Sequence, residues 1–506
     1  MTAPDHYLGL GGRLESGPSE LLVQTGFSTE TAQARYLHHW LGVADLAHVL
    51  ALRDAGAVPE AASRRLLAAL LALLGQEAEQ AGYDPRHGDA YNSREHLLRD
   101  QLGDDAGWLS LGRTRREAGR VSYYLAARAE LLALHAAVGG FCDTARRLAL
   151  AHAESWWADL TYWQPAQVST FGHYLLSVGH EASRHLDRIR RARARCALVP
   201  VAAGGVAGTT VPLSREATLD RLGLDGPATT SRDAMWSVDG LIDIAHAARQ
   251  ATLTVSRLAE DFLLFASAPF GYVRLHDSHC RASVYLPQKR NPYALSVIRG
   301  GYAVVAGRAG GVEAAMGTGS AQTDNWIYSY GETLAALGLA RQLVQLMAEV
   351  LGRARFDTPR MAALALDGFT EAADLAERLV TEEHIDYRTA HSRVARLAAD
   401  AERRGDTRLA AATDPRALVL GRPGEGSAAP ASVRASARRL RALLTRQRAW
   451  RRGAQAQAEM AIGQLVGQAR AVAMGANTPP DTPPTMGDAP IVPPEPLTAP
   501  TPEVPS

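Results

Sequence analysis

The sequence predicts an all-α fold, on three observations. Apolar residues between 238 and 267 repeat in alternating steps of three and four, which places them on one face of a long helix. No segment shows a sustained alternation of apolar and polar residues bounded by hairpin turns. With 506 residues, 46% of them hydrophobic, the chain can form two or three packed units. We expect a bundle of long helices that several subunits could share.

In chain order, two helices are predicted within residues 31–80, joined at a break over 54–59 that contains glycine and proline. Residues 82–112 are polar and predict a loop, and Gly139 and Gly140 predict a break between two helices. From residue 117 onward, helices are expected over 117–137, 141–160, 238–267, 292–317, 331–355, 370–381, 387–404 and 431–474.

Composition and charge exclude several classes of protein. A net charge of +1 gives no basic field for nucleic acid, so no nucleic-acid partner is expected. No apolar run approaches the roughly 20 residues of a membrane span, so no membrane partner is expected either. The three cysteines lie far apart without ligand spacing, and no basic-then-apolar leader is seen, which favours a cytoplasmic protein without a metal site.

The residue that stands out is Lys289, the one lysine among 54 basic residues. Lysine is a compact point charge, unlike the planar arginine fork. It follows Ser283 in a polar loop that ends at Asn291 and Pro292, a good N-cap and a good first helical residue. We therefore expect an ammonium group beside a helix N-terminus, an arrangement that binds carboxylates. An ordinary capped helix explains the last two residues but not the unique lysine.

At this segment the chain resembles the fumarase/aspartase superfamily, whose signature loop reads Gly-Ser-Ser-x-Met-Pro-x-Lys-x-Asn-Pro. Residues 282–292 keep its first Ser, its Pro, its Lys and its Asn-Pro, and the Pro-Gln-Lys form looks most like argininosuccinate lyase. The resemblance spans roughly residues 8–470. Other stretches match the same branch in the same order, and they lie at 11–14, 111–115, 164–173, 207–212, 232–233 and 256–261.

This resemblance implies a three-domain, mostly helical homotetramer without a cofactor, with each active site assembled from three chains. The domains would be an N-terminal helical domain over 1–112, a central long-helix bundle over 113–355 and a C-terminal helical domain over 356–474. Residues 475–506 form a proline-rich tail that we expect to be disordered.

The implied reaction is β-elimination from an N-substituted succinate, which releases an amine and fumarate. Ser283 matches the family's base, Lys289 would stabilise the dianionic intermediate, and Asn291 would bind the substrate carboxylate. The substrate is thus a small molecule that contains a dicarboxylate.

The sequence departs from the family at the proton donor. The family's Thr-His-Leu-Gln-x-Ala-Gln-Pro motif appears here as Thr161, Tyr162, Trp163 and Gln164, so a tyrosine replaces the histidine. A phenol, with a reference pKa of about 10, mainly donates protons. Tyr162 is therefore the candidate acid, with an aromatic filler as the competing interpretation. His173, His276 and His279 are weaker candidates.

Other departures fall where the family holds its substrate. Tyr91 stands in place of a second histidine, and Arg94 in place of an amide. Thr114 and Arg115 match a carboxylate-binding loop, in which Arg116 replaces an asparagine. Thr323 and Tyr328 lie in a poorly matching stretch that contacts the amine half in the family.

The departures leave the base unchanged and alter the residues that would contact the amine half of the substrate. This pattern predicts a carbon–nitrogen lyase with a substrate other than argininosuccinate. Two alternatives stay open from the residues alone. The chain could be a non-catalytic structural or partner-binding paralogue that has lost the histidines. It could also use the same site for amine addition or cyclisation, since a carbanion-stabilising site serves both directions.

Overall fold

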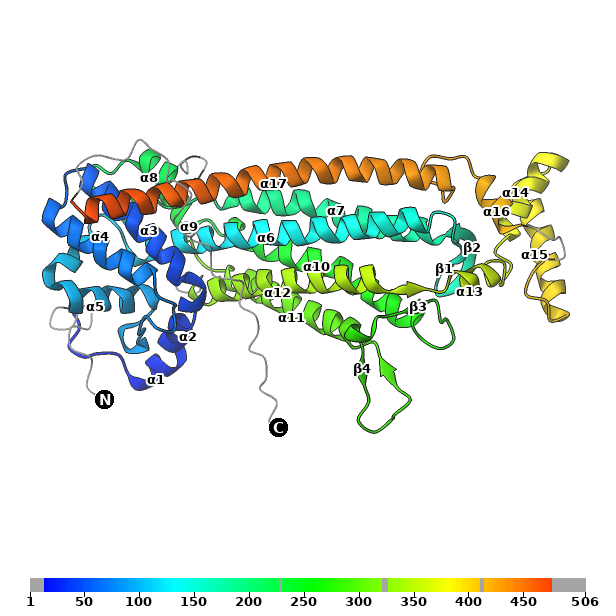
Figure 1. Ribbon diagram of the computed structural model, residues 1–506, viewed down its shortest axis with the longest axis horizontal. Helices are drawn as coiled ribbons and strands as arrows, with labels where there is room; N and C mark the ends of the chain where they lie inside the picture. Colours follow the sequence, from blue (N-terminus) through cyan, green and yellow to red (C-terminus); the bar gives the residue numbers. More distant parts are fainter. Residues whose placement is uncertain (1–12, 225, 227–229, 321–325, 410–413, 476–506) are drawn as a thin grey trace.

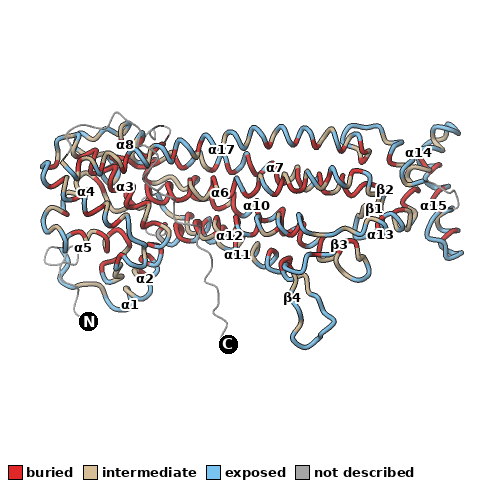
Figure 2. Tube along the Cα trace, in the orientation of Figure 1, coloured by how far each residue is buried: buried red, intermediate tan, exposed pale blue. Residues whose placement is uncertain are grey.

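A computed structural model describes residues 13–224, 226, 230–320, 326–409 and 414–475. The predicted all-α class is confirmed: long helices run side by side along the molecule, with a group of shorter helices at each end (Figure 1). The buried residues follow the centre of this bundle and the N-terminal helices, whereas the helices at the opposite end are mostly exposed (Figure 2). Thr323 and the tail over 476–506 lie outside the described residues.

The N-terminal end holds the helices that precede the bundle. The helices are α1 (Glu20–Leu22), the π-helix η1 (Val23–Phe27), α2 (Ser28–Thr31), α3 (Ala34–Asp54), α4 (Glu60–Leu74), η2 (Pro85–His87), α5 (Ala90–Leu102) and η3 (Gly103–Ser110). The α3–α4 hairpin confirms the predicted break, where Gly56 has φ +64 and Pro59 precedes α4. The loop predicted for 82–112 is wrong, because Asp89 caps α5 by accepting from the Asn92 amide at 2.9 Å.

The bundle consists of long helices that pack against one another. These are α6 (Arg115–Ala151), α7 (Phe171–Arg195), α10 (Asp239–Phe265), α11 (Tyr293–Ala315), α12 (Trp326–Arg353) and α17 (Pro430–Ala473), with the short α8 (Arg215–Arg221) and α9 (Ser231–Trp236) between α7 and α10. The apolar residues that repeat in steps of three and four form one seam along α10. All eight of them are buried, namely Leu241, Ile244, Ala248, Ala251, Val255, Leu258, Phe262 and Phe265. The seam therefore faces the core, as predicted.

The break predicted at Gly139 and Gly140 is wrong, because α6 passes through both glycines without interruption. A helical glycine costs only about 1 kcal/mol relative to alanine. The helix packs against α7, α12 and α17 along its length, and this packing outweighs that cost.

An antiparallel hairpin of β1 (Trp156–Thr161) and β2 (Gln164–Thr170) connects α6 to α7, where the sequence predicted helix up to residue 160. Its two-residue turn consists of Tyr162 and Trp163, with φ values of 52° and 61°. Both values are positive, as in a type I′ turn. The turn lacks the usual Asn-Gly signal, which is why the hairpin was missed.

The remaining elements lie beyond the hairpin or between bundle helices. They are β3 (Val273–Arg274), η4 (Asp277–His279), β4 (Arg281–Ala282), β5 (Arg290–Asn291), β6 (Arg355–Phe356), α13 (Thr358–Ala363), α14 (Ala372–Glu383), α15 (Tyr387–Arg403) and α16 (Pro415–Leu420). Helix α17 has 44 residues and returns along the whole bundle to the N-terminal end (Figure 1). Of the C-terminal helices, α14, α15 and α17 were predicted within two residues of their bounds, whereas α13 and α16 were not predicted.

Two helices, over 115–151 and 328–353, are long and apolar enough to cross a membrane by composition alone. The most apolar windows of these helices are 67% and 56% buried inside the protein. The same test is passed by core helices, and here the burial accounts for the apolar residues.

Candidate active site

The loop that carries Ser283 and Lys289 is closed by a short hairpin. Strands β4 and β5 pair Arg281 with Asn291 and Ala282 with Arg290. Ser283 and Lys289 are the residues that directly follow and precede the last pair, so they lie at the two ends of the same seven-residue loop. The loop projects from the bundle next to the β4 label in Figure 1. The hairpin therefore brings Ser283 and Lys289 to the same end of the loop, at its base.

The loop itself is exposed and lightly held. The Ser283 hydroxyl accepts a hydrogen bond from the Leu286 amide at 3.0 Å, and the Lys289 amide donates to the Leu286 carbonyl at 3.0 Å. At its base, Arg290 donates from Nε to Asp277 Oδ1 at 2.8 Å. The side chains of Val284 and Tyr285 are almost fully exposed. Such a loop can fold over a ligand without breaking core contacts.

One predicted feature of this segment is wrong. Asn291 does not cap a helix, because it pairs with Arg281 in β5. Helix α11 begins at Tyr293, with Pro292 at the capping position and no side-chain cap. The pairing holds Asn291 in extended backbone, so the helix begins one residue later than the cap motif indicated, at Tyr293. Along the chain, Lys289 is thus separated from the helix start by strand β5.

Tyr162 lies at the tip of the β1–β2 hairpin, 98% exposed. Thr161 and Gln164 pair across the turn on either side of it, and both are exposed. The hairpin covers a cavity of about 260 Å³ that is lined by Tyr162, Asp159, Tyr174 and Asp261, among other residues. Burial raises the pKa of both carboxyls. The candidate acid therefore stands beside two carboxyl groups that hold protons more readily than usual.

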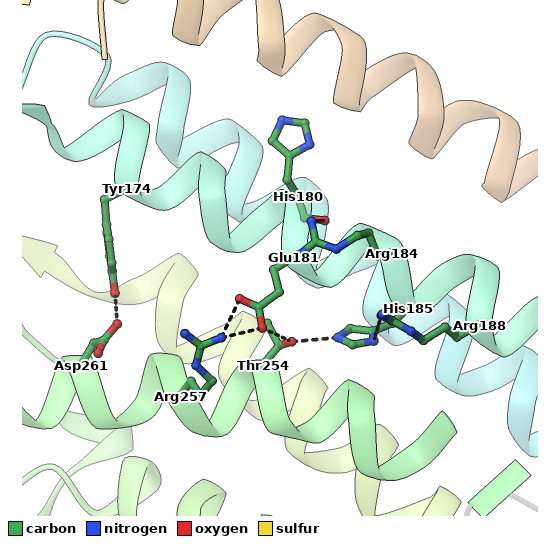
Figure 3. A network of polar contacts seen from close by, with 9 residues as sticks. All are labelled: Tyr174, His180, Glu181, Arg184, His185, Arg188, Thr254, Arg257 and Asp261. Atoms are coloured by element: carbon green, nitrogen blue, oxygen red, sulfur yellow. Dashed lines mark hydrogen bonds and ion pairs between the residues drawn. The ribbon is translucent and has the colours of Figure 1, made fainter. Parts of the chain in front are cut away.

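Two residues that line this cavity, Tyr174 and Asp261, belong to a set of polar contacts between α7 and α10 (Figure 3). Tyr174 donates from its hydroxyl to Asp261 Oδ2 at 2.7 Å. Further along the helices, Arg257 donates to both oxygens of Glu181, at 3.0 and 3.1 Å. These bonds fix α7 against α10 beneath the hairpin.

The predicted carboxylate-binding residues lie at the N-terminal end. Thr114 caps α6 by accepting from the Glu117 amide at 3.3 Å, and Arg115 and Arg116 begin that helix. Tyr91 is buried on α5 and lines a small cavity together with both arginines. Tyr328 is half exposed in the first turn of α12. The structure thus brings Tyr91, Arg115 and Arg116 together.

Within one chain the three groups of residues do not meet. Helix α6 begins at Arg115 and ends just before β1, and its 37 residues span about 55 Å at 1.5 Å per residue. Arg115 and Tyr162 therefore lie at opposite ends of the bundle (Figure 1). A site that uses both residues has to combine different copies of the chain.

Sequence reasoning did not identify Glu30, Asp159 or Asp261, which line these cavities. Asp159 was expected in a helix, and Glu30 follows Ser28 and Thr29 in a stretch typical of an exposed turn. No local signal distinguishes these carboxylates from exposed ones. Among the described residues, no group of three His, Cys, Asp or Glu side chains is placed to share a metal ion.

The chain matches known lyases along most of its length. A family model described as "Lyase" matches residues 27–307. An argininosuccinate lyase from Methanoculleus marisnigri is 32% identical over 465 residues, which cover 85% of this chain and 93% of the relative. An argininosuccinate lyase from Methanosarcina acetivorans is 30% identical and covers 78% of this chain and 79% of the relative.

Solved structures agree with these matches. An EDDS lyase variant with bound fumarate has a TM-score of 0.80 and 25% identity, and covers 93% of this chain and 99% of its own. A fumarate lyase:delta crystallin from Brucella melitensis, at 17% identity and a TM-score of 0.61, shares the fold over 81% of this chain and 91% of its own. The chain therefore belongs to the lyase family of the fumarase/aspartase superfamily, in its argininosuccinate lyase-like group.

Proposed function

We propose that this protein removes an amine from an N-substituted succinate and releases fumarate, with an amine half other than that of argininosuccinate. The observation that carries the proposal is the loop between β4 and β5, which holds Ser283 and Lys289 at its two ends. Family membership makes the chain a carbon–nitrogen lyase, and the altered residues concentrate where the amine half would bind.

In the proposed reaction, Ser283 takes the proton from the carbon next to a substrate carboxylate. The negative charge that results spreads into this carboxylate, and the ammonium of Lys289 stabilises it. The same ammonium stabilises the serine alkoxide, which is otherwise a weak base in water. Asn291, half-buried in β5, binds the same carboxylate with its amide. The loop is exposed without ligand and closes over the substrate during the reaction.

The carbon–nitrogen bond then breaks, and the electron pair leaves with nitrogen. Tyr162 donates the proton that this nitrogen needs, from the exposed tip of the hairpin. Thr161 and Gln164, on either side of the turn, position the substrate. Thr114, Arg115 and Arg116 bind the second carboxylate, Tyr91 contacts the amine half, and Tyr328 completes this side of the pocket.

Assembly of this site requires several copies of the chain, and we propose a homotetramer with the domain bounds predicted above. The separation of Arg115 from Tyr162 by the length of α6 supports this. Helix α11 adds support, because Val297 and Val304 on this apolar helix are exposed in the single chain. A bundle core shared between subunits would bury them. The three free cysteines agree with the cytoplasm as the compartment.

The direct test incubates the purified protein with a panel of N-succinyl amines, argininosuccinate included, and follows fumarate by its absorbance. Ser283→Ala should lower the rate by about 10²–10⁴-fold on any substrate that turns over. Val284→Ala is the matched control, because it changes the adjacent exposed side chain of the same loop. A panel without turnover and without carboxylate binding would instead favour a non-catalytic family member.

A further inference from the structure

Glu117, in the first turn of α6, uses its carboxylate to bind a segment outside the helix. Its position three residues after Thr114 matches a capping box, in which the Glu side chain accepts from the amide of the capping residue. Here the Glu117 amide donates to Thr114 Oγ1 at 3.3 Å, but the carboxylate accepts from the loop over 202–209. This loop is 85 residues away along the chain, so Glu117 joins two distant segments.

Three consecutive amides of the loop donate to the Glu117 carboxylate. Oε1 accepts from the Ala202 amide at 2.8 Å, and Oε2 accepts from the amides of Ala203 and Gly204, both at 3.1 Å. Ala202 and Gly204 have φ values of 55° and 56°, and such left-handed backbone turns neighbouring amides toward one anion. Glu117, Ala202 and Ala203 are buried, so these amides depend on a partner within the protein. The carboxylate therefore holds this part of the loop in its fold.

The same loop lies against the residues that precede α6. A side-chain carbon at Gly112 would come within 3.0 Å of Thr209 Oγ1, and one at Gly205 would come within 3.5 Å of the Thr114 methyl group. The loop and the backbone over 112–114 are therefore in close contact. If the loop moved away, Thr114 would lose the support behind it, and the first turn of α6 would lose its neighbour.

The charge of Glu117 is favoured by its surroundings although the side chain is buried. Burial raises the pKa of Glu117 to about 7, and the Arg113 guanidinium and the three amides lower this pKa without cancelling the shift. At pH 8 the carboxylate is therefore mostly ionised and accepts from all three amides. Kinetic and binding measurements at this pH compare variants with the charged form of the wild type.

We propose that Glu117 is a positioning residue for the site of the second substrate carboxylate: by holding the amides of 202–204, it fixes the loop against Thr114 and thereby sets the positions of Arg115 and Arg116. The inference rests on the proposed function, in which these three residues bind that carboxylate. Glu117 itself does not touch the substrate, because its carboxylate is buried and accepts from the loop.

The first test measures steady-state kinetics at pH 8 on an N-succinyl amine that turns over. Glu117→Gln places an NH2 group against backbone donors, so it should raise KM by about 10- to 100-fold and change kcat by less than about 3-fold. A variant that merely lowers the folded fraction would instead lower kcat and leave KM unchanged. An unchanged KM in Glu117→Gln would overturn the inference.

Glu371→Gln is the matched control for this measurement. Glu371 is also buried, and its carboxylate accepts from the Leu409 amide at 2.8 Å. It precedes α14, at the opposite end of the bundle from Arg115 (Figure 1). Glu371→Gln should therefore leave KM unchanged, even if it lowers stability as much as Glu117→Gln does. Equal changes of KM in the two variants would overturn the inference.

Gly204→Ala disturbs the same contact from the loop side and leaves Glu117 in place. A side-chain carbon at Gly204 would collide with the Gly208 carbonyl oxygen, so the alanine should move the loop off Glu117. KM should rise as in Glu117→Gln, and the double variant should be no worse than the worse single variant. Effects that multiply would show that the two residues act independently and would overturn the inference. This variant carries the test if circular dichroism shows that Glu117→Gln is unfolded.

Binding of succinate separates this inference from the proposed function, because succinate has two carboxylates and no amine to release. Calorimetry at pH 8 should give a dissociation constant about 10- to 100-fold higher for Glu117→Gln than for the wild type, and an unchanged one for Glu371→Gln. This result would support the positioning role even if no panel member released fumarate. Equal binding by the wild type and Glu117→Gln would overturn the role and leave the proposed function standing. A wild type that neither binds succinate nor releases fumarate would overturn both.

Discussion

Arg113 donates from Nη2 to Oδ1 of Asp45 at 2.6 Å, and both side chains are buried. The other oxygen of Asp45 accepts from Arg94 Nε at 2.7 Å, with both partners fully buried. One carboxylate therefore holds two arginines, and the Arg113 guanidinium also lies over the Tyr91 ring at 5.6 Å. This cluster joins α3, α5 and the start of α6, directly behind the cavity that contains Glu30 and Tyr91.

Asp45→Asn should strongly destabilise the protein, because it leaves two buried guanidinium groups without a counter-charge. Removing one partner of a buried ion pair typically costs about 3–5 kcal/mol. Asp400→Asn is the control, since its ion pair with Arg403 on α15 is exposed and should contribute no more than about 1 kcal/mol. The free energy of unfolding is measured in urea at equal protein concentration, because assembly also contributes to stability. Equal losses for the two variants would contradict the prediction.

The cluster also explains a substitution that the sequence alone could not. By its resemblance to the family's motif, Arg94 stands in place of an amide. The side chain is completely buried against Asp45, at a separation of 49 residues along the chain. Pairings between distant segments leave no periodic trace, so motif comparison identifies the position but not its partner.

The long helix α10 of the bundle, in contrast, could be predicted well, whereas α7 was not among the predicted helices. The eight seam residues of α10 recur with the helical period, and each of them is buried. The hairpin at Tyr162 and Trp163 could not be predicted, since its positive φ values are adopted by bulky residues that rarely form such turns. The α5 helix was not predicted because its sequence is polar. The unpartnered oxygen of Glu30 could not be predicted either, because it depends on contacts between α2, α5 and α6.

Glu30 should also make stability depend on pH. Its pKa is raised from 4.5 to about 7 by burial, so between these values the folded protein binds a proton that the unfolded chain has released. The stability that Glu30 contributes is therefore lost as the pH rises from about 4.5 to about 7, by at most roughly 1.4 kcal/mol per pH unit. Melting temperatures of wild type and Glu30→Gln, measured from pH 5 to pH 8, should diverge accordingly. Parallel curves for the wild type and Glu30→Gln would contradict this prediction. Glu20→Gln is the control, and its curve should run parallel to that of the wild type.

Lys289 should be needed as an ammonium and not only as a positive charge. Lys289→Met removes the charge next to Ser283 and should lower kcat/KM for fumarate release by about 10²–10³-fold. Lys289→Arg should restore only part of this loss, because a planar guanidinium cannot place its charge at one point. The side chain is exposed, so neither variant should change the melting temperature. Full activity of Lys289→Met would remove the lysine from the mechanism.

The acid role of Tyr162 can be separated from a mere packing role by the basicity of the leaving amine. Tyr162→Phe keeps the ring at the tip of the hairpin but cannot donate a proton. A strongly basic alkylamine leaves only when it is protonated, whereas a weakly basic arylamine leaves more easily without help. The loss of kcat should therefore be large for N-alkyl aspartates, about 10²–10⁴-fold, and small for N-aryl aspartates. Tyr285→Phe, at an 89% exposed tyrosine of the Ser283 loop, should affect both substrates little. An equal loss on both substrates would assign Tyr162 to packing, and Asp159 and Asp261 in the adjacent cavity would then be the next groups to test as proton donors.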